Sequence, residues 1–196
     1  MFHLTQPSAE DLEKQIAAAN RSIADEPRLL SLDAGLRQLR LPFGYFHDLT
    51  RFRIGLGQAA FVAAKWAFKA WAPFDIGWVR VANPEALIAV GQIVAVEART
   101  LGLWTLNFSR IAETIDTSTW YGFLYVTTKR HVEQGEERFL LQFNPTTGEV
   151  WYELEAISRP RQTLARLGLP VTRAFQHRFA RDSQQRVRAA VLTKGS

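Results

Sequence analysis

The spacing of apolar side chains changes twice along this chain. Between residues 58 and 71 they recur every three or four positions, which predicts an amphipathic helix. From Trp78 to Ser158 the spacing drops towards two, which is typical of strands. From Pro170 a helical period returns and continues to Val191, and proline is favoured at the first turn of a helix. This order predicts a strand-rich middle between two helical segments.

Turn residues divide the middle of the chain into separate strands. Strands are predicted at residues 78–82, 87–99, 103–115, 120–133, 137–144 and 149–158, with one more at 45–54 before the first helix. Asn144-Pro-Thr-Thr-Gly148 is typical of a hairpin loop, and Gln134-Gly135 is expected to form another turn. Because short turns join neighbouring strands, the sheet is expected to be antiparallel. The predicted fold class is α+β, with a curved antiparallel sheet wrapped around the long C-terminal helix.

The first 40 residues are expected to form a separate segment. Ser8 is a suitable N-cap residue, and Leu12 and Ile16 follow at helical spacing. We interpret residues 1–40 as an N-terminal extension, a helix plus a linker, and residues 41–196 as one domain.

Short motifs after residue 41 carry a resemblance to known proteins. They are Tyr45-Phe-His47, Ile54-Gly-Leu-Gly57, Trp104-Thr-Leu-Asn107 with Arg110, Gly122-Phe-Leu-Tyr125, His131-Val-Glu133, Gly135-Glu-Glu137, Ser158-Arg-Pro160 and Gln176 to Asp182. In these motifs the chain resembles an uncharacterised family, domain of unknown function nineteen-ninety, found in bacteria and plants. In the order of its elements it resembles the helix-grip fold of the START-type, pollen-allergen-like superfamily. The resemblance implies a helix-grip domain over residues 41–196 and no established activity.

Composition excludes several classes of protein. The chain has 196 residues and no cysteine, which excludes disulfides, zinc fingers and thiol nucleophiles and is typical of a reducing cytoplasm. The first 20 residues lack the apolar core of a signal peptide. The longest apolar stretch, residues 59–71, is interrupted by Lys65 and Lys69 and is too short to span a bilayer. We therefore expect a cytoplasmic, bacterial protein without a transmembrane segment.

The net charge of +5 is concentrated at one end of the chain. Residues 159–196 hold nine basic side chains and one acidic side chain. One interpretation is a surface for peripheral contact with an anionic membrane or for nucleic acid, and the other is the solvated face of a long helix. The strands lack the aromatic and basic signature of RNA-binding sheets, so we do not expect a nucleic-acid partner.

Arg110 shares a strand face with Trp104, Leu106 and Phe108. If this face points inward, the guanidinium lies in an apolar hollow and requires an acid or an anionic ligand. Arg110 and Trp104 are therefore predicted ligand contacts, and Arg110 would recognise a carboxylate or phosphate. The alternative is a structural ion pair, or a guanidinium that reaches the rim of the hollow.

Aromatic side chains are frequent in the predicted strands. Most are expected in the core, but a concave sheet lined by rings can also hold a planar or acyl ligand. The further predicted ligand contacts are Asn107, Tyr125, His47, Tyr152 and Phe175.

The densest group of polar side chains is His131, Glu133, Glu136 and Glu137. On a strand, His131 and Glu133 would face the same side, as a metal site or a His–Glu acid–base pair requires. The alternative is a solvated hairpin end whose charges prevent edge pairing. A single histidine without cysteine, and no acid-rich calcium loop, favours the alternative. We predict no metal and no cofactor.

Gly55-x-Gly57-x-x-Ala60 matches the glycine pattern of dinucleotide-binding loops. That motif requires a buried parallel strand before it and an acid at the end of the next strand. The preceding segment contains three charged side chains and the next strand ends without an acid. We interpret the glycines as a strand-to-helix turn that needs positive φ.

Three functions stay open on this basis. The first is a module that binds a small apolar or amphipathic molecule between the sheet and the C-terminal helix. The second is an enzyme, because by resemblance the helix-grip fold can house cyclases and hydrolases. It requires His131, Glu133 or Arg110 to open onto the hollow. The third is an interaction protein that uses the basic C-terminal helix.

Overall fold

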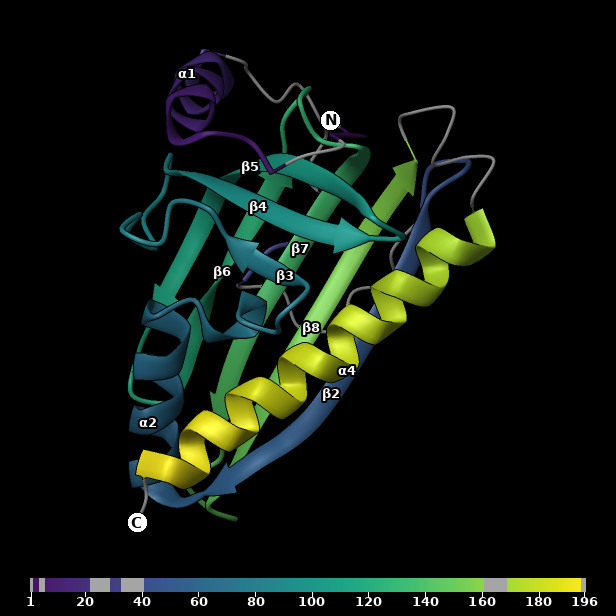
Figure 1. The fold of residues 1–196 in the computed structure, drawn as a ribbon. Helices are drawn as coiled ribbons and strands as arrows, with labels where there is room; N and C mark the ends of the chain where they lie inside the picture. The colour runs from purple at the N-terminus through teal and green to yellow at the C-terminus, as the bar shows by residue number, and fades with distance from the viewer. Residues whose placement is uncertain (1, 4–5, 22–28, 33–40, 161–168, 195–196) are drawn as a thin grey trace.

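The structure of this chain is a computed structural model that describes residues 2–3, 6–21, 29–32, 41–160 and 169–194. Most of the predicted linker before residue 41 lies outside the described residues. One antiparallel sheet forms the centre of the fold (Figure 1).

The main path of the sheet has seven strands, in the order β2-β8-β7-β6-β5-β4-β3. They are β2 (Phe46–Leu56), β3 (Val79–Val81), β4 (Ile93–Thr100), β5 (Leu103–Asp116), β6 (Trp120–Thr127), β7 (Glu133–Phe143) and β8 (Glu149–Pro160). The two-residue strand β1 (Phe2–His3) pairs with β5 off this path. From β3 to β8, strands that follow one another in the chain are neighbours in the sheet, which confirms the predicted antiparallel arrangement.

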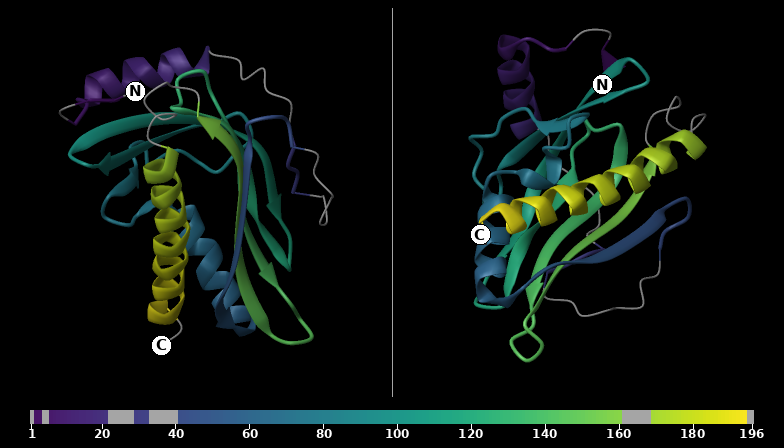
Figure 2. Two further views of the ribbon diagram at one scale, coloured as in Figure 1. Left: turned by 90° about the vertical axis from the view of Figure 1, so that its right-hand side faces the viewer. Right: turned by 60° about the horizontal axis from the view of Figure 1, so that its bottom comes forward.

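The sheet curls around α4 (Leu169–Lys194), which lies on its concave side together with α2 (Gly57–Lys69), as Figures 1 and 2 show. The short 3-10 helix η1 (Ala72–Phe74) leads from α2 to β3. Each helix buries part of the apolar stripe that predicted it, for example Phe68 on α2 and Val187 on α4. The predicted helix-grip architecture is therefore confirmed.

The connection between β6 and β7 lies elsewhere than predicted. The chain turns at residues 128–132 and not at Gln134-Gly135. The hydroxyl group of Thr128 holds this turn, since it donates to the carbonyl oxygen of Phe108 at 2.9 Å. His131 therefore lies in the turn rather than on a strand.

Gly135 lies inside β7, where it allows β8 to come close. A Cβ at this position would lie 2.0 Å from the carbonyl oxygen of Ile157. No side chain fits there, so this glycine belongs to the strand and not to a turn.

The strand predicted at 87–99 is shorter in the structure, because β4 begins only at Ile93. Gly91 has a φ of +89°, which ends any extended run before β4. The buried side chain of Asn83 fixes the chain here, since it donates to the carbonyl oxygen of Ile93 and accepts from the N–H of Ala95, both at 2.9 Å.

The glycine pattern before α2 forms the predicted strand-to-helix turn. Gly57 has a φ of +82°, and a Cβ on Gly55 would lie 2.8 Å from the Cβ of Ala60. The described strand pairs are all antiparallel, so the parallel unit of a dinucleotide site is not formed around this turn.

Two N-terminal segments cover the convex face of the sheet (Figure 2). Helix α1 (Ala9–Asn20) packs its apolar side chains on β4 and β5. Residues 29–32 lie over β7. There the N–H groups of Leu29 and Leu30 donate to the buried carboxylate of Glu136 at 2.8 and 3.0 Å. The described part of the extension is thus attached to the sheet, and a domain boundary at residue 41 stays a prediction.

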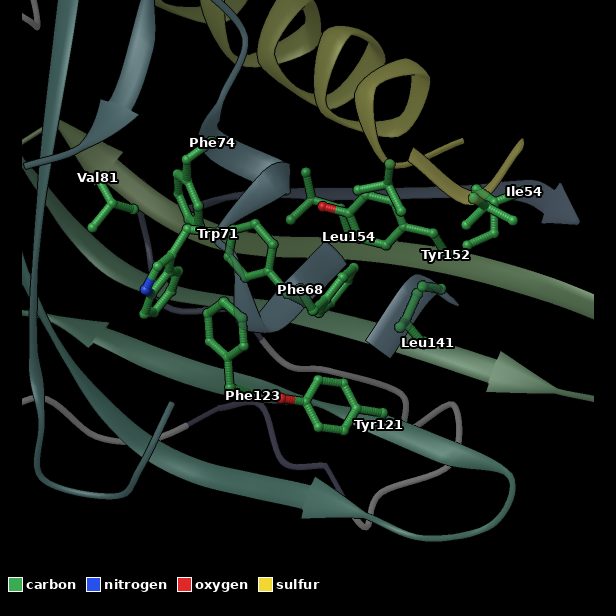
Figure 3. Close-up of a cluster of buried hydrophobic side chains, with 14 of the residues drawn as sticks. Ile54, Phe68, Trp71, Phe74, Val81, Tyr121, Phe123, Leu141, Tyr152 and Leu154 are labelled. Carbon is green, nitrogen blue, oxygen red and sulfur yellow. The ribbon is translucent and has the colours of Figure 1, made fainter. Parts of the chain in front are cut away.

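Large side chains fill the space between the sheet, α2 and the C-terminal half of α4 (Figure 3). Phe68 is fully buried, with its ring centroid 5.2 Å from that of Tyr152 and 6.4 Å from that of Phe123. We call this region the packed half of the interior. Its members include Ile54, Phe61, Ala64, Phe68, Trp71, Tyr121, Phe123, Tyr152, Val187 and Val191.

Candidate functional site

A cavity of about 200 Å³ lies between the sheet and the N-terminal half of α4, and we call it the α4 cavity. Most of its wall is apolar: Phe74, Trp78, Val96, Leu154, Phe175 and Phe179. The ring centroids of Phe74 and Phe179 lie 5.6 Å apart, and those of Trp78 and Phe175 lie 5.7 Å apart. Since a cavity of roughly 150 Å³ can hold benzene, the α4 cavity has room for a somewhat larger ring-bearing molecule.

One row of residues brings polar groups into this cavity. Tyr125, Glu137, Ala156 and Asp48 lie opposite one another on β6, β7, β8 and β2. Directly opposed residues point to the same face of a sheet, and all four line the cavity. The antiparallel register therefore gathers two acids and a phenol from three separate strands.

Glu137 carries its carboxyl group into the cavity. The hydroxyl group of Tyr125 donates to Oε2 at 2.6 Å. Burial raises the pKa of Glu137 to about 7, although the hydrogen bond from Tyr125 lowers it, and the nearby acids Glu133 and Asp48 raise it further. The carboxyl group is therefore partly protonated at neutral pH.

Glu133, the second acid of β7 in the lining, is 8% exposed. The amide nitrogen of Gln176 donates to both carboxylate oxygens at 2.9 Å. Burial raises the pKa of Glu133, and hydrogen bonds from Ser158 and Gln176 oppose this rise. These bonds tie the N-terminal half of α4 to β7 across the cavity.

Asp48 forms an ion pair with Arg173, whereas Glu133 and Glu137 form none with the described residues, although the positive charge of Arg173 is near enough to lower the pKa of Glu133. Asp48 Oδ1 accepts a hydrogen bond from Arg173 Nη2 at 2.7 Å. Within the described ranges, no lysine or arginine forms an ion pair with Glu133 or Glu137.

Six of the predicted site residues line the cavity: Asn107, Tyr125, His131, Glu133, Glu137 and Phe175. His131 reaches it from the turn after β6, where its Nδ1 accepts the backbone N–H of Glu133 at 3.0 Å. Two of the three groups that the enzyme hypothesis required thus open onto the cavity. Ligand contact by any of these residues stays a prediction.

Arg110 lies on the convex face of β5, which corrects its expected inward orientation. Leu106 and Phe108 on the same face pack beneath α1. Arg110 Nη2 donates to the carbonyl oxygen of Asn20 at 2.9 Å, at the C-terminal end of α1, where a cation is favourable. Alternation shows which residues share a face of a strand, but not which face is inside.

Trp104, His47 and Tyr152 also lie outside the cavity lining. Trp104 shares the convex face of β5. His47 Nε2 lies 2.8 Å from Glu155 Oε1 on the convex face of β2 and β8. Tyr152 belongs to the packed half, with its hydroxyl oxygen 2.9 Å from Ser183 Oγ. Trp104 and His47 thus point to the face opposite the one expected, whereas Tyr152 points inward but lies in the packed half.

Asp48 and Gln176 also line the cavity, and neither was predicted from the sequence. A usable signal existed for Asp48, because it alternates in phase with Phe52 and Ile54, which face the concave side. Gln176 follows Phe175 at the edge of the apolar stripe of α4, and periodicity alone gives such an edge position no direction.

The basic side chains of α4 are partly neutralised within the molecule. Arg178 lies 3.2 Å from Asp182, and Arg186 lies 2.7 Å from Asp75. Contact with an anionic membrane stays a prediction.

None of the helices that the structure describes has the length and apolar character needed to cross a bilayer. Among the described residues, no group of three His, Cys, Asp or Glu side chains is placed to hold a metal ion.

A family model described as "Domain of unknown function (DUF1990)" matches residues 32–186, which is most of the chain. The chain belongs to the DUF1990 family. A UPF0548 protein of Dictyostelium discoideum is 37% identical over 155 residues, which cover 74% of this chain and 72% of the relative. The resemblance found in the short motifs is thereby confirmed, and relatives of this DUF1990 protein are not confined to bacteria.

Solved structures similar to this DUF1990 protein have the helix-grip fold. Zhui aromatase/cyclase from Streptomyces sp. R1128 matches with a TM-score of 0.54 at 10% identity, over 78% of this chain and 96% of that one. Ara h 8.0201 matches with a TM-score of 0.50 at 13% identity, over 76% and 99% of the two chains. At these identities the likeness concerns the fold alone, and it confirms the predicted helix-grip fold.

Proposed function

We propose that this DUF1990 protein binds a small amphipathic molecule in the α4 cavity. The observation that carries the proposal is a hollow of about 200 Å³ with aromatic and aliphatic walls and one row of polar side chains. Each Å² of apolar ligand surface removed from water contributes roughly 25 cal/mol, so the walls supply affinity. The few polar groups would fix the orientation of the ligand, as in most small-molecule sites.

A titration with 4-phenylbutanol tests this proposal. The molecule is neutral and combines a ring with one hydroxyl group. Isothermal titration calorimetry is expected to show saturable binding with a negative heat-capacity change, because apolar surface is buried. The matched variant is Ala98→Leu. It adds side-chain volume to the cavity wall on β4, a strand that does not neighbour β7 in the sheet. Absence of binding by the wild type, or equal binding by A98L, would count against the α4 cavity as the site.

An enzyme is the second candidate, and one observation favours it. Glu137, with a pKa of about 7 beside the hydroxyl group of Tyr125, has the acidity of a group that can accept and donate a proton near neutral pH. Native mass spectrometry of gently purified protein would identify a co-purified molecule. Incubation with that molecule should change its mass with the wild type and leave it unchanged with Glu137→Gln. An unchanged molecule with both proteins supports binding alone.

A further inference from the structure

Two carboxyl groups of the α4 cavity form no ion pair within the described residues, and only Glu133 has a cation, Arg173, near enough to lower its pKa. Glu133 is held by the neutral amide of Gln176. Glu137 accepts one hydrogen bond from the described part of the chain, at Oε2, so Oε1 is left to the cavity. A buried carboxylate normally has a cationic partner or becomes protonated, since an isolated buried charge costs several kcal/mol. The described chain supplies no such partner to Glu137, so a ligand can supply one.

The apolar walls suit one kind of cation. The rings of Phe74, Trp78, Phe175 and Phe179 line the same cavity as the two acids. Ring faces attract ammonium groups, and this attraction is strongest where water is excluded. A calcium ion, in contrast, takes six to eight oxygen ligands, so rings offer it little.

We propose that the molecule bound in the α4 cavity is an organic ammonium ion: a protonated amine carried on an apolar, ring-bearing body. Glu137 and Glu133 would receive the ammonium group, and the rings would hold the body. This inference rests on the proposed function and narrows its ligand class. It also replaces the anionic ligand first expected, because Arg110 lies on the convex face and Arg173 is already paired with Asp48.

The affinity for an amine should increase with pH between about 6 and 8. Over this range Glu137 loses its proton, whereas an alkyl amine, like the lysine side chain with a pKa near 10.4, keeps its own. The titratable and charged groups that face Glu137 are Tyr125, Glu133, Asp48 with Arg173, Tyr152, His131 and His177.

Three probes that share one apolar body test the inference: 4-phenylbutylamine, 4-phenylbutanol and 4-phenylbutyrate. With the wild type near pH 8, calorimetry should show the amine binding at least about tenfold more tightly than the alcohol, a difference of about 1.4 kcal/mol. The butyrate should bind most weakly. The double variant Glu133→Gln/Glu137→Gln should lose this preference to within about threefold and still bind the alcohol.

Two further variants keep the test interpretable. Glu10→Gln removes an exposed acid of α1 and should leave all three affinities unchanged. If the double variant fails to fold by circular dichroism, the single variant Glu137→Gln serves, because its amide oxygen can still accept from Tyr125. An amine that binds no more tightly than the alcohol, or that keeps its preference in the variant, overturns this inference and leaves the proposed function standing. Failure of all three probes to bind overturns the proposed function itself.

Discussion

The two halves of the interior lie under the same helix and on the same sheet, yet one is filled and the other is hollow. In the packed half, α2 inserts Phe68 and Phe61 between α4 and the strands. In the hollow half, no side chain of α2 lines the cavity, and the following 3-10 helix η1 contributes only Phe74 to the lining. Curvature of the sheet therefore creates the space, and the position of α2 decides which end of the space stays open.

The halves also differ in the groups that they bury. The packed half buries aromatic and aliphatic side chains, with the hydroxyl group of Tyr152 paired to Ser183. The hollow half holds two acids whose pKa is raised by burial, Glu133 and Glu137. Acids in such surroundings lower stability, and groups of this kind are typically kept at sites that serve a function.

The largest contrast is expected from removing one ring in each half. Phe68→Ala should lower the free energy of unfolding by about 3–5 kcal/mol, because it leaves a void in a close-packed core. Phe175→Ala should cost about 1 kcal/mol, since its ring already borders empty space. Urea unfolding of the two variants measures both values. Equal losses would mean that the hollow half is packed after all.

Removing the cavity acid should stabilise the protein at high pH. The pKa of Glu137 is raised from 4.5 to about 7 on folding, so the folded state holds this proton more tightly than the unfolded state. The proton on Glu137 therefore stabilises the folded state in full below pH 4.5, and this contribution to stability is lost as the pH rises through about 7. Near pH 8, Glu137→Gln should be more stable than the wild type by roughly 2–3 kcal/mol, and near pH 5 the two should be similar.

Urea unfolding at both pH values measures this difference, and the exposed Glu10→Gln of α1 is the control. A variant that is less stable than the wild type near pH 8 would show that the carboxylate is well paired in the folded state.

Adding a side chain should have opposite effects in the two halves. Ala64→Leu inserts volume into the packed half, where Ala64 is fully buried, and should cost about 1–3 kcal/mol. Ala98→Leu inserts the same volume beside the cavity and should leave stability within about 1 kcal/mol of the wild type. Thermal unfolding of the pair gives the comparison, which fails if both variants lose stability alike.

The smallest effect concerns the hydrogen bond at the end of the cavity. Tyr125→Phe removes the donor to Glu137, so the pKa of Glu137 should rise further, because that bond stabilises the ionised form. The net change in stability should be about 1 kcal/mol. A carbon-detected NMR titration of the Glu137 carboxyl group reports the pKa. An unchanged or lower value would mean that Tyr125 does not donate to this acid.

The fold was predictable from the sequence because its signals are local. Proline and glycine residues separated most of the strands, period-two alternation marked β5, and aromatic residues and threonine marked β6. One exception was Gly135, which was predicted to lie in a turn although it relieves crowding against Ile157 of β8. Crowding between strands depends on a partner far away in the chain, so a single position cannot reveal it.

The site was predictable only in part, for a related reason. Tyr125 and Glu137 were recognised by residue type, but their pairing follows from the register of β6 and β7. Arg110 was misplaced because alternation does not tell which face of a sheet will be covered by α1. Residue chemistry is thus readable from the sequence, whereas its direction is set by tertiary structure.

A crystal structure of the protein soaked with 4-phenylbutanol tests the central claim most directly. The account predicts ligand density between the sheet and the N-terminal half of α4, in contact with Phe74, Trp78 and Phe179. Density in which the protein's own side chains fill this space, with no ligand bound there, would contradict it.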